Sequence, residues 1–134
     1  MTGIGIPDKA VATLRDAARA AAANAYAPYS GFRVGAACIG EDGQIHSGSN
    51  VENASYGLTM CAERNAIYQA VAAGHQQIRA LLVYTPTPEP VTPCGACRQV
   101  ICEFGDSIRV ICCCDGPAVR EFTSGDLLPD QFRL

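Results

Sequence analysis

The chain has 134 residues, of which 49% are hydrophobic and 17% charged, a balance that suits one globular domain with a single core. Its formal net charge is −3 and its ten Lys and Arg residues are scattered singly, so we expect no nucleic-acid partner, because such partners need clustered positive charge. No apolar run approaches the roughly 18 residues of a membrane span and no signal-like stretch opens the chain, so we expect a cytoplasmic protein that does not contact a membrane.

The first half of the chain begins with a helical pattern and continues with a hairpin. An alanine-rich segment with apolar residues at helical spacing predicts a helix that begins near Pro7 and ends before Pro28. Residues 32–39 have the composition of a strand. The turn signal at residues 40–43 then predicts a hairpin whose second strand is residues 44–49.

The second half alternates helical and extended patterns. A polar loop covers residues 50–59. We expect Gly74 and Gly105 each to end a helix, and we place Thr92 at an N-cap with Pro93 as the first helical residue. The predicted helices and strands that follow the loop are, in order, helix 60–73, strand 78–85, helix 93–104, strand 108–114 and strand 118–123.

This order of elements predicts a single domain over residues 1–134. The alternation of strand and helix implies two parallel crossovers, which are right-handed by strong preference. The fold class is therefore α/β, a three-layer α/β/α sandwich with a mixed five-stranded sheet. Both inner helices would begin at the same edge of the sheet, the edge at which α/β proteins place their sites. The thiol of Cys61 would thereby meet those of Cys94 and Cys97.

Eight cysteines in a chain without a signal peptide favour buried thiols, ligands or nucleophiles over a disulfide framework. Cys38 and Cys112 to Cys114 fall in predicted strands, and Cys102 turns to another helix face than Cys97. We expect all of them to be core thiols. Only two histidines are present, so a metal site would have to depend on thiolates.

The Cys-x-x-Cys pair at Cys94 and Cys97 has three possible meanings: a redox dithiol, a structural zinc site or a catalytic zinc site. The redox interpretation is disfavoured because the motif follows a proline-rich loop rather than a strand. Structural zinc needs four protein ligands. With the other cysteines assigned to the core, only Cys61 is available to join Cys94 and Cys97, which gives three ligands and disfavours a structural site. Three ligands and one open position are typical of catalytic zinc, and Glu63 is placed to relay protons beside the metal.

Three thiolates around one Zn²⁺ leave a net charge of −1, which would weaken the metal as a catalyst. Two helix N-termini would supply opposing positive potential. Arg64, next to Glu63, is a candidate to offset more of that charge by bonding to the sulfurs. The position of Arg64 alone is equally compatible with a solvated arginine on the helix surface. We interpret Arg98, which is less well placed, as structural.

Taken together, these motifs resemble the small, homotetrameric cytidine deaminases. The similarity covers nearly the whole chain. Zinc deaminases combine a catalytic glutamate with a Pro-Cys-x-x-Cys motif, and the matching residues here are Glu63 and Pro93-Cys94-x-x-Cys97. The segments that carry the resemblance are Ala-Tyr-Ala-Pro-Tyr-Ser at 25–30, Phe-Arg-Val-Gly-Ala-Ala at 32–37, Asn-Val-Glu-Asn-Ala-Ser-Tyr at 50–56, Cys-Ala-Glu-Arg at 61–64, Pro-Cys-Gly-Ala-Cys-Arg-Gln-Val at 93–100 and Leu-Leu-Pro at 127–129.

The resemblance implies hydrolytic deamination of cytidine and 2′-deoxycytidine in pyrimidine salvage, with one Zn²⁺ per chain and Glu63 as the proton carrier. It implies a homotetramer with its sites at subunit boundaries. The implied zinc ligands are Cys61, Cys94 and Cys97. The implied substrate contacts are Asn50 and Glu52 to the ribose 3′-hydroxyl, Phe32 and the Ala62 backbone to the base, Ala54 and Tyr56 to a neighbouring subunit's site, and Phe132 at a subunit boundary.

Two alternative functions remain open at this point. One is the same chemistry on a cytosine-bearing antibiotic, whose zinc site would be identical. A nucleotide or polymer substrate is disfavoured, because the charge of Glu52 would repel a phosphate and the chain is acidic. The other alternative is a non-enzymatic structural zinc module, which predicts four protein ligands and a dispensable Glu63.

Overall fold

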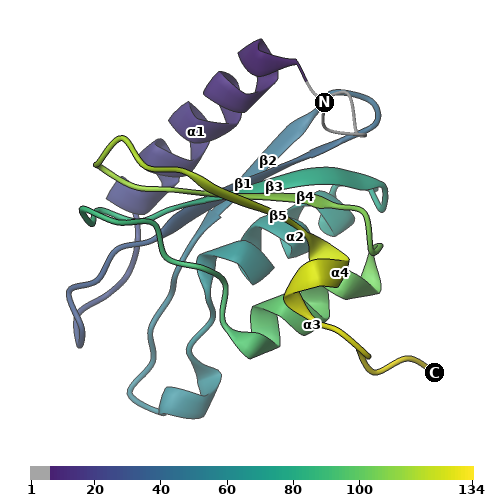
Figure 1. Ribbon diagram of the computed structural model, residues 1–134. Helices are drawn as coiled ribbons and strands as arrows, with labels where there is room; N and C mark the ends of the chain where they lie inside the picture. Colours follow the sequence, from purple (N-terminus) through teal and green to yellow (C-terminus); the bar gives the residue numbers. More distant parts are fainter. Residues whose placement is uncertain (1–6) are drawn as a thin grey trace.

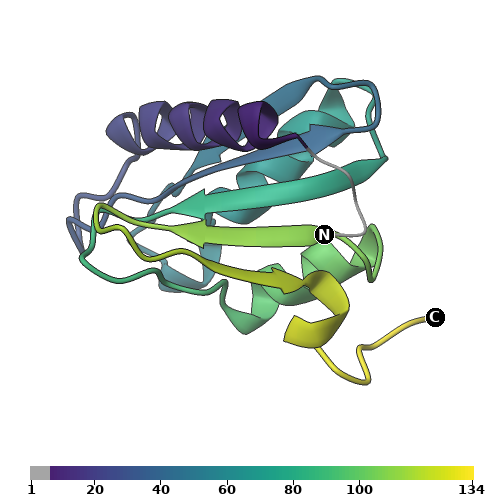
Figure 2. The same cartoon turned by 45° about the horizontal axis from the view of Figure 1, so that its top comes forward.

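The computed structural model describes residues 7–134 as three layers. Helix α1 (Asp8–Ala23) covers one face of a central sheet. Helices α2 (Ala62–Ala72) and α3 (Gly95–Glu103) cover the other face (Figures 1 and 2). The predicted three-layer α/β/α sandwich is thereby confirmed.

The sheet has five strands in the spatial order β2-β1-β3-β4-β5. All neighbouring pairs are antiparallel except β3 and β4. Since β2 and β3 are both antiparallel to β1, they run in the same direction, and the two predicted parallel crossovers are confirmed. The strands are β1 (Gly35–Gly40), β2 (Ile45–Ser49), β3 (Ile78–Tyr84), β4 (Arg109–Cys113) and β5 (Arg120–Thr123).

The core is divided by the sheet into two clusters, because side chains along a strand point alternately to opposite faces. On β3, Leu81 and Val83 pack in the cluster beneath α2 and α3, whereas Ala80 and Leu82 pack against α1. A sheet covered on both faces explains why β1 and β3 are almost continuously apolar.

Three predicted boundaries were wrong at the edge of the sheet that carries the site. The first strand begins at Gly35 rather than at residue 32, because the N–H of Val34 and the carbonyl of Phe32 bond to the Asn50 side chain rather than to the backbone of a neighbouring strand. The second helix begins at Ala62, so Cys61 is its N-cap residue rather than a member of the first turn.

The third wrong boundary concerns α3. Its N-cap residue is Cys94 and not Thr92, and Pro93 lies before the helix. The Cys94 backbone is extended, with φ −69° and ψ 169°, and its carbonyl accepts the first helical hydrogen bond from Arg98 at 3.0 Å. The Thr92 hydroxyl instead accepts a hydrogen bond from the Arg98 guanidinium.

Two short helices were not predicted. A 3₁₀ turn, η1 (Tyr56–Leu58), lies within the polar loop, and α4 (Ser124–Leu127) follows β5. The last strand is correspondingly shorter than predicted and begins at Arg120. Both helices are about one turn long, too short for apolar periodicity to appear.

Close packing of α2 on β2 requires a glycine at position 48. A Cβ atom built there would lie 2.5 Å from the backbone nitrogen of Ala66. We expect Gly48→Ala to lower the free energy of unfolding by about 1–3 kcal/mol, since α2 would have to move off the strand. Urea denaturation measures this loss. Gly57→Ala, where no atom lies within 4 Å, is the matched control, and equal stability of the two variants would contradict the packing argument.

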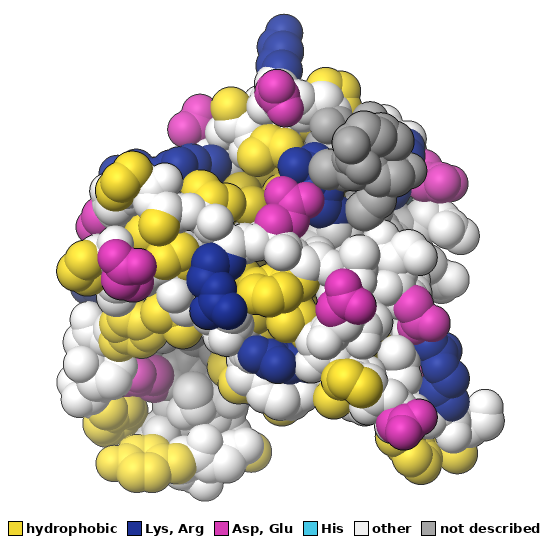
Figure 3. Space-filling model, viewed as in Figure 1, with side chains coloured by type: hydrophobic (Ala, Val, Ile, Leu, Met, Phe, Trp, Pro, Cys, Tyr) yellow, Lys and Arg dark blue, Asp and Glu magenta, His cyan; other side chains and the backbone are white. Residues whose placement is uncertain are grey.

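Positive charge is dispersed on the face of the molecule that Figure 3 views. Figure 3 shows Lys and Arg side chains on the viewed face as separate patches interspersed with Asp and Glu. A continuous basic stripe, which binding to a phosphate backbone needs, is not seen on that face. Within residues 7–134, none of the helices has both the length and the apolarity to cross a membrane.

Candidate metal centre and active site

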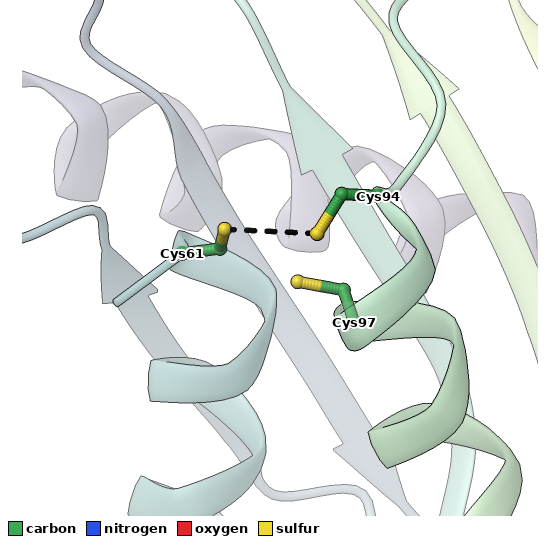
Figure 4. A group of neighbouring side chains, drawn as sticks. All are labelled: Cys61, Cys94 and Cys97. Atoms are coloured by element: carbon green, nitrogen blue, oxygen red, sulfur yellow. Dashed lines mark hydrogen bonds between the residues drawn. The ribbon is translucent and has the colours of Figure 1, made fainter. Parts of the chain in front are cut away.

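Three cysteine thiols meet where α2 and α3 begin. Cys61 is the N-cap residue of α2, Cys94 is the N-cap residue of α3, and Cys97 is the third residue of α3. Figure 4 shows the three side chains pointing toward one another. Their sulfur atoms all lie within 4.8 Å of one another, and the sulfurs of Cys61 and Cys94 are 3.9 Å apart.

This geometry fits a tetrahedral zinc ion. With Zn–S bonds of about 2.3 Å, two sulfur ligands of a tetrahedral site lie about 3.8 Å apart. The observed separation between Cys61 and Cys94 is close to that value. Within the described part of the chain, no fourth His, Cys, Asp or Glu ligand atom joins the group. The donor set therefore matches three-ligand zinc with one open position.

The protein opposes the negative charge of the thiolates in two ways. The N-termini of α2 and α3 both face the cluster, and helix N-termini favour negative charge. The Arg64 Nη2 atom also donates to the Cys61 sulfur at 3.4 Å. Hydrogen bonds from the nearby Cys97 thiol and from Arg64 lower the pKa of Cys61, and the Cys61 sulfur raises the pKa of Arg64. Cys61 is thus prepared to bind as a thiolate.

Glu63 lies beside the cluster in the first turn of α2. Its side chain is only 6% exposed, yet it lines a cavity that is shared with Cys61 and Cys94. Burial raises the pKa of the Glu63 carboxyl to about 7. A carboxyl group that titrates near neutral pH can both accept and donate protons, as general acid–base catalysis requires.

The cavity next to the thiols has a volume of about 220 Å³. It is mostly apolar, with a few polar groups near the cysteines, as is common for small-molecule sites. Its walls come from the starts of both helices, the end of β3, the segment before β1 and the loops before α2 and α3. The lining residues are Phe32, Val34, Asn50, Thr59, Cys61, Ala62, Glu63, Val83, Thr85, Val91, Thr92 and Cys94.

Asn50, Ala62 and Phe32, three of the residues predicted from the resemblance, lie in this wall. Asn50 is 9% exposed, and its side chain accepts from Val34 N at 2.9 Å and donates to Phe32 O at 2.8 Å. Ala62 is fully buried at the start of α2. Phe32 is 39% exposed and lies before β1, so it is a wall residue rather than part of the core.

Glu52 does not line the main cavity. Its carboxylate lies in an adjoining hollow, which Tyr56 also lines. Thr59 lines both spaces. Glu52 accepts hydrogen bonds from the backbone N–H groups of Tyr29, at 2.9 Å, and Ser30, at 3.1 Å.

The three remaining predicted contacts lie on the surface. Ala54 is exposed in the loop before α2, and Tyr56 is 78% exposed. Phe132 is 69% exposed in the C-terminal tail, where its carbonyl accepts from the Gln99 side chain at 3.2 Å. Within this chain, these three side chains lie outside the lining of the main cavity.

The sequence analysis missed several wall residues, namely Val34, Thr59, Val83, Thr85, Val91 and Thr92. Thr59, Val91 and Thr92 directly precede the predicted starts of the two helices, and that position was their only signal. Val34, Val83 and Thr85 lie within predicted strands, where nothing in the sequence marked them as wall residues. Its interpretation of the other thiols is confirmed, because Cys38, Cys102 and Cys112 to Cys114 are all buried. Arg98 is structural as predicted, since its guanidinium donates to Pro93 O at 2.7 Å and Leu127 O at 3.1 Å.

Comparisons with known proteins agree with this geometry. Residues 9–114 match the family model of the cytidine and deoxycytidylate deaminase zinc-binding region. A cytidine deaminase of Sporosarcina psychrophila is 49% identical over 109 residues, which are 81% of this chain and 80% of that protein. One of Mycobacterium tuberculosis is 46% identical over 129 residues, which are 96% and 94% of the two chains. The crystal structure of a cytidine deaminase from Burkholderia pseudomallei matches with a TM-score of 0.87 at 49% identity, covering 90% of this chain and 98% of that one.

The α/β/α fold, the three-thiol centre and the family match together define a zinc-binding enzyme of the deaminase class. The family match covers most of the chain, and each of the relatives named above is matched over at least four-fifths of its length. The chain belongs to the cytidine and deoxycytidylate deaminase family, and its cofactor is Zn²⁺.

Proposed function

We propose that this chain catalyses the hydrolytic deamination of cytidine and 2′-deoxycytidine to uridine and 2′-deoxyuridine, with release of ammonia, in pyrimidine salvage. The observation that carries the proposal is the placement of the buried Glu63 carboxyl and the three-thiol cluster on one cavity of nucleoside size. The names of the relatives support the same reaction.

Cys61, Cys94 and Cys97 would hold one Zn²⁺ per chain, and the bound ion lowers the pKa of water and so supplies a nucleophile at neutral pH. Glu63 accepts a proton from the attacking water and delivers one to N3 of the cytosine ring. It then helps the 4-amino group leave as ammonia. A Glu63 pKa of about 7 suits both directions of transfer. Arg64 offsets the charge of the thiolates through its bond to Cys61.

The walls of the cavity are suited to a nucleoside. Phe32 offers an aromatic surface to the pyrimidine, and the Ala62 backbone at the start of α2 offers polar groups to its edge. Asn50 and Glu52 contact the ribose 3′-hydroxyl from the sugar side. The negative charge of Glu52 disfavours a substrate with a phosphate in that place.

We place the enzyme in the cytoplasm as a homotetramer. Tyr56 and Leu58 both lie in the short helix η1 and are 78% and 68% exposed, and neighbouring exposed apolar side chains support a subunit contact there. Phe132 in the C-terminal tail is 69% exposed and offers a separate apolar contact. In such an assembly Ala54 and Tyr56 contribute to a neighbouring subunit's site, and Phe132 packs at the boundary.

A comparison of substrates tests the proposed function. We expect similar kcat/KM values for cytidine and 2′-deoxycytidine, and values lower by at least about tenfold for deoxycytidylate, because no Lys or Arg side chain lines the described cavity to pair with its 5′-phosphate. Steady-state rates on these three compounds and on a cytosine-bearing antibiotic make the comparison. Absence of activity on both nucleosides, or a preference for deoxycytidylate or the antibiotic, would overturn the assignment.

A further inference from the structure

The turn before β1 is joined to the loop before α2 by the Glu52 carboxylate. Its Oε1 atom accepts hydrogen bonds from Tyr29 N, at 2.9 Å, and Ser30 N, at 3.1 Å, while Oε2 accepts from the Ser30 hydroxyl. All three bonds cross 22 or 23 residues of sequence. Backbone bonds join the two segments at Tyr26, and the Glu52 carboxylate extends this connection to Tyr29 and Ser30 in the turn.

The Ser30 hydroxyl makes a second bond on the other side. Its oxygen accepts from the backbone N–H of Phe32 at 3.0 Å. The Phe32 carbonyl accepts in turn from Asn50 Nδ2 at 2.8 Å. Both backbone polar groups of Phe32 are thus fixed by side chains, one through Ser30 and one through Asn50. The Phe32 ring lines the main cavity, whereas Ser30 and Glu52 line the adjoining hollow.

We propose that Ser30 is a positioning residue of this site, whose hydroxyl couples the Glu52 carboxylate on the sugar side to the backbone of Phe32 on the base side. The inference rests on the proposed function, because it assumes that sugar and base occupy these two adjoining spaces. Glu52 and Phe32 then form a single recognition unit. A change at Glu52 reaches Phe32 through one hydroxyl group, with no direct contact between the two side chains required.

The steady-state kinetics of Ser30→Ala on cytidine test this coupling. We expect KM to rise about tenfold, since a hydrogen bond to a charged group is lost, while kcat and zinc content stay near those of the unmodified protein. Ser30→Thr, which keeps the hydroxyl, should restore KM. Ser107→Ala is the matched control, because Ser107 is exposed before β4 at the opposite end of the sheet.

Two further readouts separate positioning from general destabilisation. The hydrogen bond from the Ser30 hydroxyl is the main cause of the lowered pKa of Glu52. Its loss in Ser30→Ala should raise that pKa, so the fall of 1/KM at acid pH should move to higher pH. A double-mutant cycle with Glu52→Gln should be strongly non-additive, because Ser30 acts through the carboxylate. The KM of the double variant should therefore lie within about twofold of that of Glu52→Gln alone.

Hydrogen exchange of the Phe32 amide gives a test that does not depend on activity, and we expect faster exchange in Ser30→Ala. An unchanged KM and exchange rate in Ser30→Ala, or additive effects in the cycle, would overturn the inference while leaving the proposed function standing. If the unmodified protein does not deaminate cytidine, the proposed function fails. The exchange rate of the Phe32 amide then decides alone whether Ser30 positions Phe32.

Discussion

Glu63→Gln is expected to reduce kcat by about 10² to 10⁴ while the protein keeps its zinc. Glutamine has nearly the same size as glutamate, so it fills the same buried position, but its amide cannot accept and return a proton. Glu63 is 6% exposed and is not one of the three clustered sulfur donors, so its replacement leaves the metal ligands untouched. Steady-state kinetics on cytidine, with zinc analysis of the same sample, measure both quantities.

Glu103→Gln is the matched control for this change, because Glu103 is an exposed residue at the end of α3. It should retain full activity and full zinc content. Retention of most activity by Glu63→Gln would show that proton transfer does not pass through this carboxyl, and a structural zinc module would then be the better account. Loss of zinc in Glu63→Gln would instead make the carboxyl a metal ligand.

Cys94→Ala is expected to release zinc almost completely, from one ion per chain to less than about a tenth, and to abolish activity with it. Two thiolates alone do not hold the ion at ordinary concentrations. The start of α3 should also loosen, because Cys94 is its N-cap residue and Arg98 bonds to the Cys94 carbonyl. Metal analysis of the purified variant and its thermal unfolding measure the two effects.

Cys102→Ala provides the comparison on the same helix. The Cys102 thiol is buried and donates to Ser124 O at 3.3 Å, away from the cluster. It should keep its zinc and activity, and lose only a modest amount of stability through the small cavity created. Equal zinc loss in both variants would mean that general unfolding, and not ligand removal, releases the ion.

Much of the fold and the centre of the site could be predicted from the sequence because both follow strong patterns. Long apolar strands and helices with regular periodicity predicted the correct sheet and layers. The two crossovers brought Cys61 to Cys94, which lies 33 residues further along the chain, and to Cys97. Spacing and topology together are enough when each ligand lies at the start of a predicted helix.

What could not be predicted depends on irregular backbone. Nothing in the local sequence shows that the Asn50 side chain accepts a hydrogen bond from Val34 N, or that the Glu52 carboxylate bonds to the turn carrying Ser30. Thr59 lines both spaces only because the bridge between Val51 and Met60 folds the loop back on itself. Such contacts join segments far apart in the chain, and they leave no periodic signal.

X-ray absorption spectroscopy of the zinc in the purified protein, with zinc analysis of the same sample, tests the central claim most directly. The three-thiol geometry predicts one zinc per chain, with three sulfur neighbours at about 2.3 Å and one lighter neighbour at about 2.0 Å. A coordination shell completed by a fourth protein side chain, or a protein purified without metal, would contradict a hydrolytic centre at the starts of α2 and α3.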